Sequence, residues 1–277
     1  MPINFNELFR KINYQLPIGA SNRAGDLERT GNWSYEAQYS LGEEYQFVEK
    51  EVKKGKHYFQ RFFISTWSQD SQQDEKLSND GIAEFARDTA RSYVGRSGNC
   101  RERTGLMLVY LLEERANVDY EFSLINFYPP IDHQLLLVKP KNGGQAYCVD
   151  PWTEKVVKYE DFNSYIPEML DIIIKNEKAR AIAQEIQAQK ENEFLNTIKM
   201  GYKQMGYKPE DLKKEIRESS KKIVDYCTRA KNEMSLVSDK LSVKSISPSQ
   251  QRDFIGKFYS ERDKLIDSHY PKKPRKK

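Results

Sequence analysis

The chain has 277 residues, enough for about two domains of average size. Hydrophobic residues make up 38%, aromatic residues 12% and charged residues 31%, a composition that excludes wholesale disorder. The net charge is +4, and five of the basic residues lie within 272–277, so no basic face outside this tail predicts nucleic-acid binding.

The longest fully apolar run, residues 106–112, is too short to cross a bilayer. Residues 1–15 lack the basic and then apolar pattern of a secretory signal. The sequence therefore predicts a soluble, cytoplasmic protein without a membrane span. The tail 271–277 resembles a nuclear import signal, and it equally fits a phosphate-binding or membrane-binding tail or a solvated chain end.

The N-terminal segment, residues 1–75, is expected to complete the core or to form a lid on it. Apolar spacing over residues 5–12 predicts a short amphipathic helix. The stretch 19–31 contains glycine, asparagine, aspartate and serine residues typical of turns, which predicts a loop. Aromatic, partly alternating segments at 33–39 and 57–65 predict strands.

Two helices and three strands are expected in the next part of the chain. Helical spacing of apolar residues predicts a helix over 82–94 that ends at Gly95. After a turn, a second helix is expected from Cys100 to about Arg115. Its interior, residues 106–112, is apolar on every side, which predicts a central helix buried by its neighbours. The strands are expected at 120–127, 134–139 and 145–150.

After residue 160 the sequence becomes highly charged and favours helix. Long helices are expected over 165–205, 209–242 and 248–268. The predicted organisation is an α+β fold in which the N-terminal segment is followed by a catalytic core (76–160), a helical bundle or arm (161–268) and a basic tail (269–277).

The residues that carry predicted chemistry are Cys100, His133 and Asp150. The chain has three cysteines and no CxxC pair, so reduced thiols are expected. Cys100 stands where the buried helix begins, and a helix N-terminus stabilises the reactive thiolate. A nucleophilic cysteine needs a base, and the base needs a group that orients it. Of the three histidines, we select His133 because His57 and His269 have no comparable surroundings.

The strands that carry His133 and Asp150 suggest how these residues meet. If the strands form an antiparallel hairpin centred on Lys141 and Asn142, His133 and Asp150 lie directly opposite one another. Opposed side chains have Cβ atoms about 5 Å apart, a separation that suits an imidazole–carboxylate hydrogen bond. A slip of one residue would place the two side chains on opposite faces of the sheet.

Each of these residues also has an ordinary structural explanation. A cysteine at a helix start is most often simply buried, and an Asp-Pro step at a strand end is a common turn. Asn99 fits a helix N-cap as well as an oxyanion donor, and Trp152 fits packing as well as a shield over the site. A weaker alternative is a zinc site, because the spacing lacks a CxxC or HxxxH element. Its ligands would be Cys100, His133, Cys148 and Asp150, whereas our prediction includes neither metal nor cofactor.

The local sequences SGNC, DHQLLLV and AYCVDPW contain Cys100, His133 and Asp150. They resemble the transglutaminase-like branch of the papain-like superfamily, where a G-x-C motif opens the central helix, a histidine begins a strand and an aspartate ends the next. The resemblance covers residues 80–160, and the compact spacing is similar to that of bacterial members, including effectors that act on host proteins. It implies a central helix packed on a small antiparallel sheet, with a helical region appended.

The resemblance implies cysteine-dependent acyl transfer on a protein substrate, by a glutamine deamidase or a transglutaminase. Cys100 would form a thioester, His133 would act as base and then as acid, and Asp150 would hold the imidazole. The backbone N–H of Cys100 and the side chain of Asn99 would stabilise the oxyanion.

Two alternatives remain open at this point. One is a thiol protease with the same triad, and the other is a non-catalytic interaction module that binds its partner through residues 161–268. The expected partner is a protein substrate or a host protein. Secretion without a cleavable signal into a host cell, with nuclear targeting by the tail, is the alternative to a cytoplasmic location.

Overall fold

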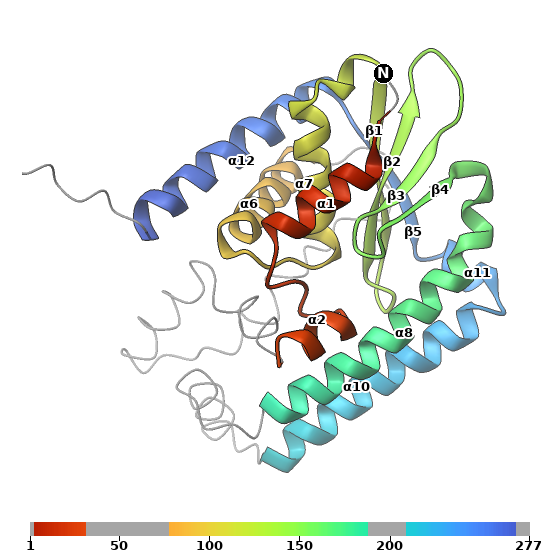
Figure 1. Ribbon diagram of the computed structural model, residues 1–277. Helices are drawn as coiled ribbons and strands as arrows, with labels where there is room; N and C mark the ends of the chain where they lie inside the picture. The colour runs from red at the N-terminus through yellow and green to blue at the C-terminus, as the bar shows by residue number, and fades with distance from the viewer. Residues whose placement is uncertain (1–2, 32–77, 188–208, 270–277) are drawn as a thin grey trace, which may run out of the picture.

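The computed structural model describes residues 3–31, 78–187 and 209–269. These residues have an α+β fold with one antiparallel sheet in the strand order β4-β3-β2-β1-β5 (Figure 1), which confirms the predicted class. The strands are β1 (Tyr120–Phe127), β2 (His133–Pro140), β3 (Tyr147–Asp150), β4 (Lys155–Lys158) and β5 (Leu241–Ile246). The α-helices are α1 (Phe5–Gln15), α2 (Ala24–Arg29), α6 (Asn79–Gly95), α7 (Cys100–Glu113), α8 (Phe162–Gln187), α10 (Pro209–Ala230), α11 (Met234–Ser238) and α12 (Pro248–His269).

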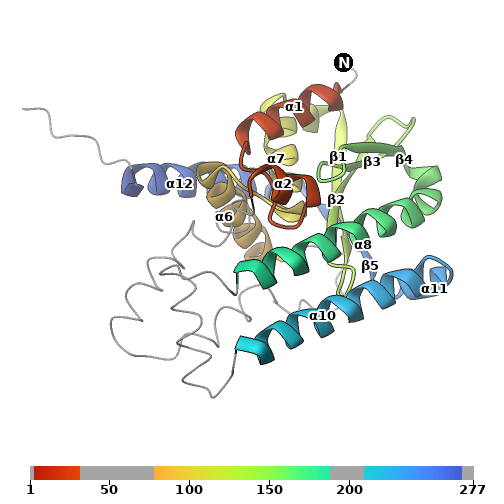
Figure 2. The same ribbon diagram turned by 60° about the horizontal axis from the view of Figure 1, so that its bottom comes forward.

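The sheet is covered by helices on both faces. Successive side chains of a strand point to opposite faces. On β1, Phe122 and Leu124 pack in one cluster with α1, α6, α7 and α12, whereas Ile125 and Phe127 pack in a second cluster with α8 and α10. Figures 1 and 2 show these two groups of helices on opposite sides of the sheet. The molecule therefore has three layers, with the sheet in the middle.

The central helix expected from the sequence is α7. Its residues Leu106, Met107 and Leu108 are fully buried, which confirms the prediction drawn from the apolar run. The adjacent helix α6 approaches α7 at Gly105, where an added Cβ would lie 1.9 Å from Oγ1 of Thr89. Glycine at this position therefore allows the two helices to pack closely.

The C-terminal region is not an arm appended to a separate core. Residues 241–246 form β5, which pairs with β1, so the predicted helix over 209–242 is wrong at its end. Helix α12 packs on α6, and the ring centroids of Phe254 and Phe85 are 5.1 Å apart. The predicted boundary near residue 160 therefore does not separate two cores, because burial against β1 and α6 determines the structure of this region.

The described part of the N-terminal segment packs on the core. Helix α1 extends the predicted helix to Gln15 and buries Leu8 and Ile12 in the cluster around α7. The predicted loop 19–31 is wrong in its second half, where α2 forms. The strands predicted at 33–39 and 57–65 and most of the tail 269–277 lie outside the described residues.

Candidate active site

The three residues selected from the sequence meet at one end of the sheet. Cys100 is the first residue of α7, His133 is the first of β2 and Asp150 is the last of β3. The side chains of all three are buried. Nε2 of His133 lies 2.8 Å from Oδ2 of Asp150. The predicted histidine–aspartate hydrogen bond is therefore present.

The register that brings this pair together differs from the predicted one. Leu137 pairs with Cys148 and Leu136 with Val149, a shift of two residues. Asp150 consequently stands beside Leu135, and His133 is its diagonal neighbour. Because the side-chain period of a strand is two, this shift keeps both side chains on the same face.

The carboxylate of Asp150 accepts four hydrogen bonds. Oδ1 accepts from the backbone N–H groups of Trp152 (3.0 Å) and Thr153 (3.2 Å). Oδ2 accepts from His133 and from the hydroxyl of Tyr165 at 3.1 Å. Burial alone would raise the pKa of Asp150, but His133 and the donors of Thr153 hold this pKa below its ordinary value. The carboxylate is thus kept charged and fixed in orientation.

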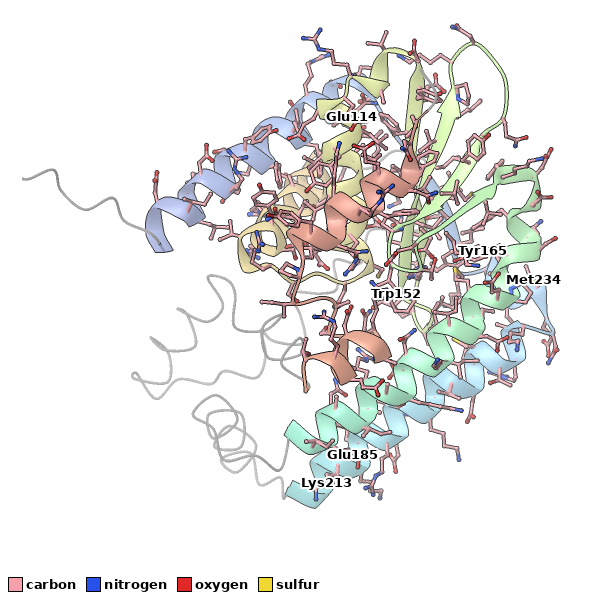
Figure 3. All side chains as sticks on the ribbon, in the orientation of Figure 1. Glu114, Trp152, Tyr165, Glu185, Lys213 and Met234 are labelled. Carbon is pink, nitrogen blue, oxygen red and sulfur yellow. The ribbon has the colours of Figure 1, made fainter. Side chains whose placement is uncertain are left out.

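His133 is shared between Asp150 and Cys100. Burial alone would lower the pKa of His133, but the Asp150 carboxylate and a hydrogen bond with Cys100 raise it. Because Nε2 faces Asp150, Nδ1 is the ring nitrogen left for the hydrogen bond with Cys100. The ring of Trp152 lies edge-on to the imidazole with centroids 5.2 Å apart, and its Nε1 donates to Oδ1 of Asn22 at 2.9 Å. Trp152, labelled in Figure 3, therefore packs against the histidine.

Cys100 has its sulfur at the N-terminus of α7, 3.9 Å from the backbone oxygen of Asp132. The first N–H groups of a helix have no intrahelical acceptor and carry partial positive charge, which stabilises an anion there. Asn99 is the N-cap residue, but its Oδ1 accepts from the backbone N–H (2.9 Å) and hydroxyl (3.0 Å) of Ser21. Glu102 accepts from the backbone N–H of Asn99 at 2.8 Å. The side chain of Asn99 thus connects the turn before Cys100 to the N-terminal segment.

A buried arginine anchors the same turn. Arg103 is 1% exposed, and it donates to the backbone oxygen of Gly98 (3.1 Å) and to Oδ1 of Asn13 (2.9 Å). The backbone oxygen of Gly19 accepts from the N–H of Gly98 at 3.0 Å and from the hydroxyl of Ser97 at 2.7 Å. Residues 13–21 therefore hold the turn that presents Cys100.

Four further residues support the site and were not predicted from the sequence: Ser21, Asn22, Arg103 and Tyr165. Only Arg103 had a usable signal, because a charged residue within a helix that is expected to be buried needs specific partners. Ser21, Asn22 and Tyr165 contact the site only through residues far from them in the sequence, so no local pattern marks them.

The other two cysteines are buried in the apolar core. Burial raises the pKa of the Cys148 thiol and that of the Cys227 thiol to about 12 each. Cys148 packs among apolar side chains of the sheet, and Cys227 does so between α10 and α8. Among the described residues, no three His, Cys, Asp or Glu side chains are grouped so that they could hold a metal ion. This finding gives no support to the zinc alternative.

Comparison with known proteins found no relative from which a role for these residues could be transferred. No protein-family model, curated protein or solved structure matches the chain. Within 3–31, 78–187 and 209–269, the helices are too short or too polar to span a membrane.

Proposed function

We propose that the protein is a cysteine-dependent acyl transferase of the transglutaminase-like type that acts on glutamine side chains. The observation that carries the proposal is the buried imidazole of His133, which is shared between Asp150 at 2.8 Å and the Cys100 thiol at a helix start. The order of the three residues along the chain and their placement on helix, strand and neighbouring strand agree with that branch of the papain-like superfamily.

The proposed reaction begins at the sulfur of Cys100. The thiolate attacks the side-chain carbonyl carbon of glutamine, and the N–H groups at the start of α7 stabilise the oxyanion. The C–N bond breaks, His133 gives its proton to the leaving ammonia, and a thioester remains on Cys100. A water molecule then gives a proton to His133 and attacks the thioester, which releases glutamate and restores the thiolate–imidazolium pair. A lysine amine in place of water yields an isopeptide bond.

The proposal is tested by mass spectrometry of a glutamine-containing peptide library incubated with the wild-type protein. We expect conversion of glutamine to glutamate, or an amide adduct when a primary amine is added, and neither product with Cys100→Ala. Cys148→Ser is the matched control and should keep the activity. Peptide-bond cleavage that depends on Cys100 would instead identify a protease, and equal products from wild type and Cys100→Ala would overturn the proposal.

A further inference from the structure

Tyr165 of α8 reaches the triad from the layer of helices opposite to α7. Its side chain is 5% exposed, and its hydroxyl lies 3.1 Å from Oδ2 of Asp150 and 2.8 Å from Oγ1 of Thr153. Figure 3 shows Tyr165 on α8 beside the sheet. The residue touches none of the atoms that react in the proposed chemistry.

The direction of the hydrogen bonds follows from the donors available. An ionised carboxylate only accepts, so Tyr165 donates its single hydroxyl proton to Asp150. Thr153 must then donate to the oxygen of Tyr165. A chain of three groups, from Thr153 through Tyr165 to Asp150, thus ends on the same oxygen that binds His133.

We propose that Tyr165 is a positioning residue that keeps the Oδ2 atom of Asp150 charged and aimed at His133. The role in catalysis rests on the proposed function, whereas the effect on the His133–Asp150 pair does not. Oδ1 is already held by two backbone N–H groups. Without Tyr165, Oδ2 would keep the hydrogen bond of His133 and lose the bond of the Tyr165 hydroxyl.

The nearby charged groups do not provide this function. On β4, Lys155 stands opposite Asp150, but its Nζ pairs with Oε1 of Glu168 at 3.0 Å. Among the described residues, the other titratable groups that interact with the pair are Cys100, Tyr165 itself and Asp132, whose carboxyl interacts electrostatically with His133. Removing one hydrogen bond to the ionised form of Asp150 should therefore raise its pKa.

The test is a pH titration of the Tyr165→Phe variant in which NMR of ¹⁵N-labelled histidine monitors the His133–Asp150 pair. The chain has only three histidines, so the His133 signal can be assigned with His133→Ala. At low pH, Asp150 takes up a proton and the downfield Nε2–H signal of His133 is lost; this part of the titration is called the acid limb. We expect the acid limb to move up by about one pH unit in Tyr165→Phe. Alkylation of Cys100 at pH 6 should fall several-fold. Tyr226→Phe is the matched control, because its hydroxyl donates to the backbone oxygen of Leu236, away from the triad.

Thr153→Val is a second variant in case Tyr165→Phe does not fold. It removes the hydroxyl that binds Tyr165 and also interacts with Asp150, and it keeps the backbone N–H bond to Asp150. It should move the acid limb in the same direction by a smaller amount. An unchanged acid limb and Nε2–H signal in folded Tyr165→Phe or Thr153→Val would overturn the inference. A shifted acid limb in a protein that shows no acyl transfer would retain the inference and reject the proposed function instead.

Discussion

His133 and Asp150 are diagonal neighbours on adjacent strands, and their side chains meet at 2.8 Å between Nε2 and Oδ2. The contact depends on the register of β2 against β3, because a shift by one residue would place the two side chains on opposite faces. Backbone donors from the turn after β3 hold the carboxylate in place. The contacts within the fold are therefore sufficient to build the histidine–aspartate pair.

The pair should make stability depend on pH. Asp150 and Cys100 raise the pKa of His133 from 6.5 to about 10 against the effect of burial, so its stabilising contribution is complete below about pH 6.5 and lost as the pH rises toward 10. The pKa of Asp150 is lowered, so its contribution is lost as the pH falls below its ordinary value of 3.8. Urea unfolding of wild type and Asp150→Asn should show a stability difference that shrinks from pH 7 to 10. Parallel stability curves over that range would contradict this prediction.

Replacing Arg103 should loosen the turn that precedes Cys100. Arg103→Met leaves the backbone oxygen of Gly98 and the side chain of Asn13 without their buried donor, which should cost about 3 kcal/mol. The free energy of unfolding measures the loss, and Cys100 should alkylate more slowly in the folded variant. Arg252→Met, on the exposed side of α12, is the control and should change stability by less than about 0.5 kcal/mol. Equal stabilities for the two variants would argue against the anchoring role.

Two glycines near the N-terminus should respond in opposite directions to alanine. Gly19 has φ +87° and lies against Asp26, whose Cγ would be 2.3 Å from an added Cβ. Gly19→Ala should therefore destabilise the protein by about 2 kcal/mol or more and slow alkylation of Cys100. Gly25 lies in α2 with no heavy atom within 4 Å of an added Cβ, so Gly25→Ala should stabilise by about 0.5–1 kcal/mol. Thermal unfolding of both variants checks the contrast, and a neutral Gly19→Ala would be evidence against the tight contact.

The sequence predicted the elements with strong local patterns. The strand expected at 120–127 is β1, and the helix expected from Cys100 is α7, because apolar segments and flanking turn residues mark both. Cys100, His133 and Asp150 were also selected from the sequence, since each stands at the end of such an element, and the structure brings them together. A local sequence pattern was therefore sufficient to predict a residue's place wherever that place depends on one helix or strand alone.

The prediction failed where distant contacts decide the structure. The loop between β2 and β3 has Gly143 and Gly144 at positive φ, and a loop of this length does not fix the register. The short strand β5 depends on pairing with β1, whose residues lie over a hundred positions earlier in the chain. The hydroxyl of Tyr165 reaches Asp150 only because α8 packs on the sheet.

The most direct test of the central claim is the alkylation rate of Cys100 by iodoacetamide between pH 6 and 8, in wild type and in His133→Ala. Mass spectrometry reports Cys148 and Cys227 in the same sample as buried reference thiols. We expect Cys100 to react fast at pH 6, with little dependence on pH, and at least about tenfold more slowly at pH 6 without His133. A Cys100 whose rate rises about tenfold per pH unit, as for an ordinary thiol, and is the same in folded His133→Ala would contradict a cysteine–histidine pair.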